Sequence, residues 1–232
     1  MQEKAAVVIV AAGASRRMQG RDKLWLPLAG RLILARTIDV FQTSPLIDAI
    51  VLVASPQRIT ETTTLCQQER WNKVAAVVTG GKRRQDSVCI GLDTLAEIQP
   101  ACRWVMIHDA ARPLVTPAMI EAGLQAAREH QAAIAAVPVK DTIKQVQDGR
   151  ISTTLDRSLL WTVQTPQVFS FPLIQQAHHS PIADEDMTDD ATLCERLGYM
   201  VTIFPGSYTN IKITTEEDLL IATALLQGNT TL

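Results

Sequence analysis

The chain has 232 residues, of which 47% are hydrophobic and 20% charged, as expected for one globular domain and not for a disordered chain. Its formal net charge of -2 excludes a general attraction to nucleic acid or to an anionic membrane, so anion binding must come from local clusters of basic side chains. The four cysteines form no CxxC pair, which favours a reduced, cytoplasmic compartment. The longest apolar run, residues 5–12, is far shorter than the roughly 20 residues that span a bilayer, and we expect no membrane insertion.

Short β-branched runs alternate along the chain with helix-length amphipathic segments. The strands are expected at 6–11, 49–54, 74–78, 104–108, 134–137 and 200–204, and the helices at 32–41, 56–69, 87–97, 117–130 and 215–226. This alternation is typical of an α/β fold with a mainly parallel, Rossmann-like sheet and helices on both faces. The sequence therefore predicts a single domain spanning residues 1–232.

Residues 139–155 interrupt this alternation. Two polar, β-prone runs flank Asp148-Gly149, which is a typical β-hairpin turn. The hairpin has too few apolar residues to form a core, so it is either a solvent-exposed arm or an element that packs on another subunit. Leu155 and Trp161 nearby favour the second reading. We therefore predict a β-arm at about residues 138–157 that supports a homodimer.

The segment after the first strand combines small residues with cations. Ala11, Ala12 and Gly13 are followed by four basic residues within positions 16–23, and the carboxyl ends of strands are where open α/β sheets bind ligands. Small residues let the backbone approach a phosphate, and Arg17 and Lys23 would add charge-assisted contacts. Neither GxGxxG nor GxxxxGK[ST] occurs, which weakens the NAD and simple NTPase readings. The alternative is a turn with solvated arginines.

A second glycine-rich turn, residues 80–88, follows the third expected strand. It contains Gly80-Gly81 and the cations Lys82, Arg83 and Arg84. Main-chain groups and the Ser87 hydroxyl could recognise a flat pyrimidine edge, although a tight turn with a solvated basic run explains the pattern equally well.

The fourth expected strand ends at His108-Asp109, with Arg112 three residues further on. Asp109 could hold Mg²⁺ or its water, because nucleotidyl transfer needs a hard cation and a carboxylate is its usual protein ligand. We interpret His108 as a packed strand-end side chain. Arg112 either binds a substrate phosphate or pairs with an acid, and the sequence favours neither.

Several motifs together resemble one enzyme family over nearly the whole chain, the 2-C-methyl-D-erythritol 4-phosphate cytidylyltransferases. The motifs that carry the resemblance are residues 11–18 with Lys23, 80–88, 108–113, 141–142, 156–157, 165–167, 188–189 and 210–212. The resemblance implies that CTP and the phosphorylated polyol condense, with Mg²⁺, to a CDP-alcohol and pyrophosphate. No nucleic acid or membrane takes part in such a reaction.

The resemblance also implies roles for individual residues. Arg17, Lys23 and Lys212 would contact the phosphates and stabilise charge on them during transfer. The residues implied to hold the nucleotide are Ala11, Ala12, Gly13, Gly81, Lys82 and Ser87. The residues implied to bind the acceptor are Asp109, which is also the metal candidate, with Arg112, Thr142, Arg157, Thr165 and Thr188. Thr142 and Arg157 would reach the acceptor phosphate of a second subunit from the arm.

The chain departs from the family pattern at two positions where acidic residues are common, Lys82 and Thr209. Only one carboxylate is therefore assigned to the metal. The rival readings are a ribitol 5-phosphate cytidylyltransferase, a glycosyltransferase, which would carry a DxD pair absent at position 109, and a non-catalytic nucleotide-binding regulator. His178 and His179 lie in a polar segment, and the sequence leaves their role open.

Overall fold

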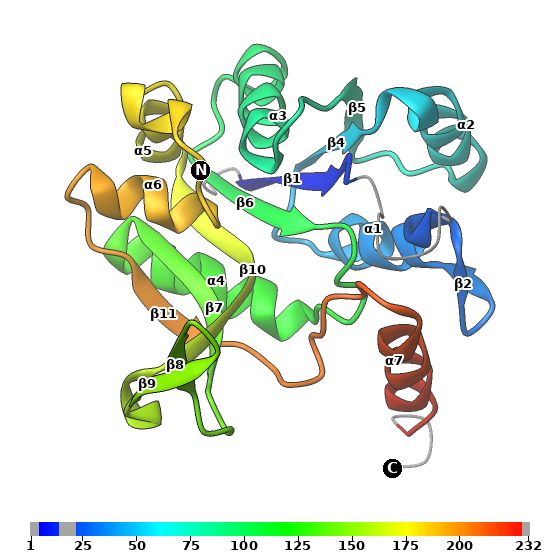
Figure 1. The fold of residues 1–232 in the computed structure, drawn as a ribbon. Helices are drawn as coiled ribbons and strands as arrows, with labels where there is room; N and C mark the ends of the chain where they lie inside the picture. Colours follow the sequence, from blue (N-terminus) through cyan, green and yellow to red (C-terminus); the bar gives the residue numbers. More distant parts are fainter. Residues whose placement is uncertain (1–4, 14–21, 229–232) are drawn as a thin grey trace.

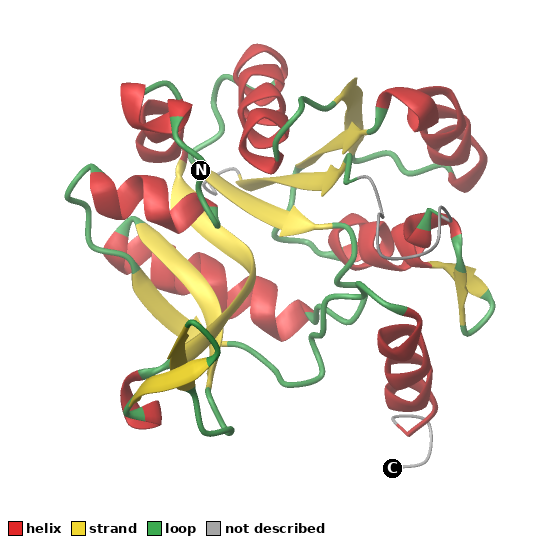
Figure 2. Ribbon diagram, viewed as in Figure 1, coloured by secondary structure: helices red, strands yellow, loops and turns green. Residues whose placement is uncertain are grey.

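The computed structural model describes residues 5–13 and 22–228. Its centre is a seven-stranded sheet with the order β11-β7-β10-β6-β1-β4-β5, seen in yellow in Figure 2. The strands are β1 (Ala5–Ala11), β4 (Ala49–Ala54), β5 (Val74–Thr79), β6 (Trp104–Asp109), β7 (Ala132–Pro138), β10 (Trp161–Ser170) and β11 (Thr202–Pro205). All neighbours pair in parallel except β10, which runs antiparallel to both β6 and β7.

Helices cover both faces of this sheet (Figure 1). They are α1 (Ile33–Thr43), α2 (Ile59–Glu69), α3 (Arg84–Ile98), α4 (Pro117–His130), α5 (Phe171–His178), α6 (Asp190–Arg196) and α7 (Glu216–Gly228). Successive strand residues point to opposite faces, so Val7 and Ile9 pack in the cluster under α1 and α4, while Ala6 and Val8 pack in the cluster under α3 and α5. The predicted α/β fold with a mainly parallel sheet is confirmed.

Three of these elements were missing from the sequence prediction: β10, α5 and α6. β10 is a central strand, but it contains Pro166 and the polar side chains of Gln164, Thr165 and Gln167, and proline is unfavourable inside a sheet. The pairing of β10 with β7 shifts register between Val163 and Gln167, around this proline. The structure also adds a short ribbon of β2 (Pro27–Leu28) and β3 (Arg31–Leu32).

The predicted hairpin is present as β8 (Lys144–Gln147) and β9 (Arg150–Thr154), which form a separate two-stranded sheet. Asp148 and Gly149 have φ angles of 50° and 74°, as a two-residue hairpin turn of this hand requires. Every residue of both strands is exposed. In Figure 1 the hairpin projects from the end of β7, away from α1 and α3.

Four short 3₁₀ turns complete the described elements, at Lys23–Trp25, Pro56–Arg58, Arg157–Leu159 and Pro181–Asp184. Within the part of the chain that the structure describes, no helix combines the length and apolar character needed to cross a membrane.

Candidate active site

A cavity of about 540 Å³ opens at the carboxyl ends of β1, β5 and β6, a size in the range of small-molecule sites. It is lined by Val10, Ala12, Gly13, Lys23, Leu24, Gly81, Lys82, Arg83, Arg84, Ser87, Asp109, Ala111, Lys212 and Thr214. The loops after the three strands meet here because parallel strands end at the same edge of the sheet. Most residues predicted to hold the nucleotide therefore share one cavity.

The loop after β1 is described only in part. Ala11 ends the strand, and Ala12 and Gly13 line the cavity. Arg17 lies outside the described residues. Lys23 lies at the start of the turn Lys23–Trp25, which is capped by the Asp22 carboxylate accepting a hydrogen bond from the Leu24 amide at 3.2 Å. Among the described residues of this loop, the structure thus brings Lys23 to the cavity.

The second loop is tightly built around Ser87. The Gly81 amide donates to Ser87 Oγ at 3.1 Å, and this hydroxyl faces the Arg83 carbonyl at 3.2 Å. Ser87 is only 2% exposed, so its hydroxyl holds the loop in shape as well as lining the cavity. A Cβ at Gly80 would lie 2.4 Å from Ala12 Cβ. The two loops are therefore in contact through a glycine that no larger residue can replace without movement.

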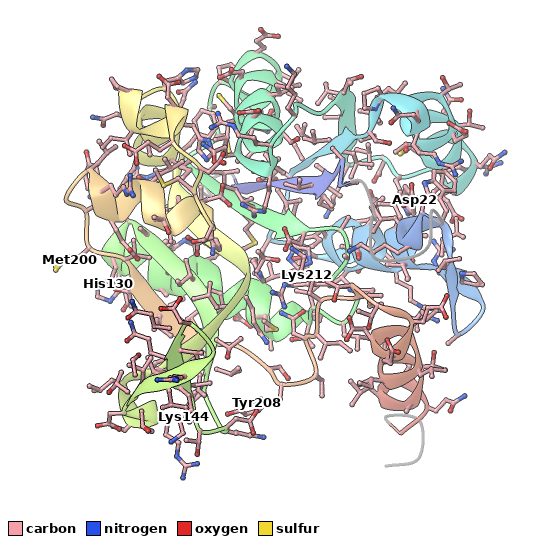
Figure 3. The ribbon with its side chains drawn as sticks, viewed as in Figure 1. Asp22, His130, Lys144, Met200, Tyr208 and Lys212 are labelled. Carbon is pink, nitrogen blue, oxygen red and sulfur yellow. The ribbon has the colours of Figure 1, made fainter. Side chains whose placement is uncertain are left out.

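Asp109, at the end of β6, lies among three cations. Its carboxylate is 3.1 Å from Arg84 Nε, 2.7 Å from Lys212 Nζ and 3.9 Å from Arg112 Nε. Burial alone would raise the pKa of Asp109, but the three cations outweigh it and hold the pKa well below its usual range. Asp109 is therefore an anion that orders three cations, and Figure 3 shows Lys212 beside the carboxyl end of β6.

A second cavity, of about 410 Å³, lies on the β10 side of Asp109. Its lining includes Arg112, Thr165 and Thr188, three of the residues predicted to bind the acceptor. Three side chains line both cavities, and they are Arg84, Asp109 and Lys212. This shared triad, which we call the junction, stands between the predicted nucleotide cavity and the predicted acceptor cavity.

A chain of hydrogen bonds fixes the backbone of Asp109. The Asp109 amide donates to Thr165 Oγ1 at 3.0 Å, and this hydroxyl lies 3.2 Å from His108 Nδ1. His108 Nε2 lies 3.2 Å from the Arg112 carbonyl. Burial lowers the pKa of His108 to about 4, so its ring is neutral, with Nε2 as donor and Nδ1 as acceptor. The interpretation of His108 as a packed side chain is confirmed, and the Thr165 hydroxyl supports the strand end.

Arg112 faces an acid and also lines the second cavity. Its Nη1 donates to the Asn210 carbonyl at 2.8 Å, and its Nε faces Asp109 without a hydrogen bond of its own. The same side chain lines the second cavity. Arg112 therefore lies next to an acid within the protein. A ligand phosphate in the second cavity would lie within reach of its guanidinium.

The residues around Asp109 do not make a metal centre. One carboxylate oxygen contacts Arg84, and the other contacts Lys212 and faces Arg112, so a directly bound Mg²⁺ would have to displace a cation. Over the described ranges, the one group of three clustered ligand-type side chains is Cys89, Asp93 and His179, which does not include Asp109. The donor set fits a cation brought by a ligand better than one held by the protein.

Two predicted acceptor residues lie elsewhere in the chain. Thr142 and Arg157 are exposed at the base of the arm, where Arg157 Nη1 donates to the Lys140 carbonyl at 2.8 Å. Neither lines either cavity. Figure 3 shows Lys144 of the arm well away from Lys212. Within one chain, the arm does not reach the junction.

Arg84 and Asp190 were not predicted as site residues from the sequence, and the role of His178 was left open. Arg84 lay in the basic run and in the motif of residues 80–88 that supports the family resemblance. Asp190 is 1% exposed and binds Arg84 Nη1 at 2.7 Å and His178 Nε2 at 3.2 Å. His178 is buried against this carboxylate, whereas His179 is exposed. The helical pattern of α5, which buries His178 but not its neighbour, was not recognised in the sequence.

Comparison with known proteins gives a consistent result. A family model described as 2-C-methyl-D-erythritol 4-phosphate cytidylyltransferase matches residues 5–228. A protein of that name from Dehalococcoides mccartyi is 48% identical over 228 residues, 98% of both chains, and one from Halalkalibacterium halodurans is 44% identical over 95% of this chain and 96% of its own. The solved 4-diphosphocytidyl-2C-methyl-D-erythritol synthase of Anaerococcus prevotii has a TM-score of 0.85 at 30% identity and covers 98% of this chain and 100% of that one.

The doubly covered sheet, the cationic loops at its carboxyl edge and the anion between them define an α/β nucleotidyltransferase. The solved Anaerococcus prevotii structure shares this architecture over the whole of its chain. The chain belongs to the 2-C-methyl-D-erythritol 4-phosphate cytidylyltransferase family. The family predicted from the sequence motifs is thereby confirmed.

Proposed function

We propose that the chain condenses CTP with 2-C-methyl-D-erythritol 4-phosphate to give 4-diphosphocytidyl-2-C-methyl-D-erythritol and pyrophosphate. The observation that carries this proposal is the junction, where Arg84, Asp109 and Lys212 line both cavities at once. A triphosphate in the first cavity and a phosphate in the second would meet there. Family membership supplies the identity of the two substrates.

The reaction is an in-line displacement. A phosphate oxygen of the acceptor attacks the α-phosphorus of CTP, the new P–O bond forms, and the bond to the β-phosphate oxygen breaks to release pyrophosphate. The acceptor phosphate is already an anion, so no side chain has to remove a proton or form a covalent bond. Arg17, Lys23 and Lys212 stabilise the negative charge that builds on the transferred group, and catalysis is positioning plus electrostatics.

The nucleotide is held by the two loops in contact at Gly80. Ala11, Ala12 and Gly13 offer main-chain amides to the triphosphate, and Gly81, Lys82 and Ser87 surround the base and ribose. Support comes from the shared cavity, which contains Ala12, Gly13 and these last three residues. Main-chain groups fixed by the Ser87 hydroxyl give the flat edge that selects cytosine.

Mg²⁺ would come with the nucleotide substrate as the counter-ion of the CTP triphosphate. This assignment follows from Asp109, whose oxygens already serve Arg84, Lys212 and Arg112. The metal supplies neutralisation of phosphate charge. Asp109 holds the surrounding cations in place and faces the acceptor hydroxyls, with Thr165 and Thr188 on the other wall of that cavity.

The acceptor half is completed by the arm of a second subunit in a homodimer. Val146 and Ile151 of the arm are 56% and 64% exposed, and an apolar pair on a free hairpin is unfavourable unless a partner covers it. Thr142 and Arg157 would then reach the acceptor phosphate of the partner's site.

Mixing two inactive variants tests whether the arm of one subunit completes the site of the other. Lys212→Met disables the body of a site and Arg157→Met disables an arm. If arms cross, a heterodimer keeps one intact site, and random exchange should restore about a quarter of wild-type activity. If each chain uses its own arm, both kinds of site are damaged and the mixture stays inactive. Light scattering of the wild type gives the expected dimer mass.

A comparison of two acceptor substrates tests the proposed reaction. Pyrophosphate release is measured with CTP and Mg²⁺, using methylerythritol 4-phosphate or ribitol 5-phosphate as acceptor. We expect much faster release with methylerythritol 4-phosphate, and the reverse order would assign the chain to the pentitol class. CTP binding without turnover on either acceptor would favour a regulator instead.

A further inference from the structure

Buried ionic contacts extend from the junction into the protein beyond the two cavities. Arg84 donates from Nε to Asp109 and from Nη1 to Asp190, at 3.1 and 2.7 Å. The other Asp190 oxygen lies 3.2 Å from His178 Nε2. One continuous series of polar contacts thus runs from Lys212 through Asp109 and Arg84 to Asp190 and His178.

The inner half of this line is sealed from water. The side chains of Asp190 and His178 are each 1% exposed, and that of Arg84 is 27% exposed. Burial would raise the pKa of Asp190, but Arg84 and the His178 hydrogen bond hold it below its ordinary value. Asp190 is thus a buried anion whose charge is balanced chiefly by one guanidinium. It lines neither cavity.

The position of Asp190 is fixed by β10 and α6. Asp189 caps α6 by accepting from the Thr192 amide at 3.0 Å. Gln167 of β10 donates to Asp189 at 2.8 Å and accepts from the Ala191 amide at 3.2 Å. Asp190 lies between Asp189 and Ala191, which make these hydrogen bonds. Its backbone is therefore held in place, and its carboxylate binds Arg84 from a fixed position.

Arg84 has donors left over for a ligand. Its Nε and Nη1 are used by the two carboxylates, and Nη2 has no hydrogen-bond partner among the described residues. The planar guanidinium fixes the direction of Nη2 once the other two nitrogens are held. Because Arg84 lines both cavities, the two anchors hold its remaining donors close to the place where the cavities meet.

We propose that Asp190, supported by His178, is a positioning residue that orients Arg84 for transfer at the junction. The proposal rests on the proposed function, because it assigns Arg84 to the phosphate that is transferred or to the one that attacks. Asp190 touches no substrate. Its effect reaches the reaction through the guanidinium alone.

A double-mutant cycle tests this coupling, using Asp190→Asn, Arg84→Gln and the double variant in the CTP and methylerythritol 4-phosphate assay. We expect Asp190→Asn to lower kcat on the order of 10-fold to 100-fold, since a displacement of about 1 Å at a reacting centre costs this much. In the Arg84→Gln background, Asp190→Asn should alter kcat less than about 2-fold, because the guanidinium through which Asp190 acts is absent. The double variant removes both members of the buried pair and is expected to fold.

Asp93→Asn is the matched control, because Asp93 also pairs with a histidine, His179 at 2.7 Å, but on the surface. It should leave kcat unchanged. If Asp190→Asn does not fold, His178→Gln with and without Arg84→Gln tests the same coupling to Arg84. Equal losses in both backgrounds, or a lower melting temperature with unchanged kcat and KM, would overturn the inference. Absence of turnover in the wild type would instead overturn the proposed function.

Discussion

Gly80 offers the sharpest test of how the two loops cooperate. A methyl group at this position would lie 2.4 Å from Ala12 Cβ, 2.7 Å from Ser87 Oγ and 3.2 Å from Val53 Cγ1. Ordinary carbon contacts are about 3.5–4.0 Å. Gly80→Ala must therefore push Ala12 and Ser87 outward by about 1 Å. Ala12 belongs to the proposed phosphate loop and Ser87 to the proposed base loop, so the change separates the two halves of the nucleotide cavity.

The expected cost is kinetic as well as structural. Misplacement of about 1 Å in a binding site lowers the rate on the order of 10²-fold, and overpacking costs about 1–3 kcal/mol of stability. We expect kcat/KM for CTP to fall on the order of 10-fold to 100-fold, with the melting temperature lower by about 2–4 °C for each kcal/mol. Steady-state pyrophosphate release at varied CTP and thermal unfolding measure the two effects.

Gly123→Ala provides the matched control. Its added methyl would lie 2.8 Å from Val168 Cγ2 and 2.9 Å from Phe204 Cζ, so it overpacks α4 against the sheet without touching either loop. It should lower the melting temperature comparably and leave the KM for CTP unchanged. The reasoning fails if Gly80→Ala binds CTP as the wild type does, or if Gly123→Ala raises KM equally.

Two further predictions concern the charges near Asp109. Lys212→Met should lower kcat on the order of 10²-fold with little change in melting temperature, because the Lys212 side chain is 40% exposed; a purely thermal effect would contradict its role. His108 has a folded-state pKa of about 4, lowered by burial, below its unfolded value near 6.5. Its contribution is present above pH 6.5 and is lost as pH falls towards 4, about 2 kcal/mol at pH 5. Urea unfolding at pH 7 and 5 should show this loss in the wild type but not in His108→Gln, and equal losses would refute it.

Four of the strands that the sequence predicted, β1, β4, β6 and β7, have residues buried on both faces. All six residues of Ala49–Ala54 are buried. A continuous apolar run of this kind is typical of a strand that is covered on both faces, so the sequence predicts it. In β10, by contrast, Gln164, Thr165 and Gln167 are buried because they bond Ser207, Asp109 and Asp189. The pattern of apolar residues along a sequence does not predict which polar side chains are buried with their hydrogen bonds satisfied.

The same distinction applies to the site. Gly13, Gly81 and Asp109 stand at or directly after strand ends, where local pattern and topology together predict a ligand edge. The pair Arg84 and Asp190 is separated by 106 positions, and only the packing of α6 near the start of α3 brings it together. Spacing along the chain carries no signal for such a contact.

The charge distribution explains how a chain with a net charge of -2 can hold a triphosphate. The 540 Å³ cavity is lined by five cationic side chains, Lys23, Lys82, Arg83, Arg84 and Lys212, and by one carboxylate, Asp109. Without Asp109 these cations would repel one another and spread apart. With it, Arg84 and Lys212 are drawn to a single point, and the cavity still keeps a positive excess for the nucleotide. The anion at the centre of a phosphate site thus concentrates positive charge more than it cancels it.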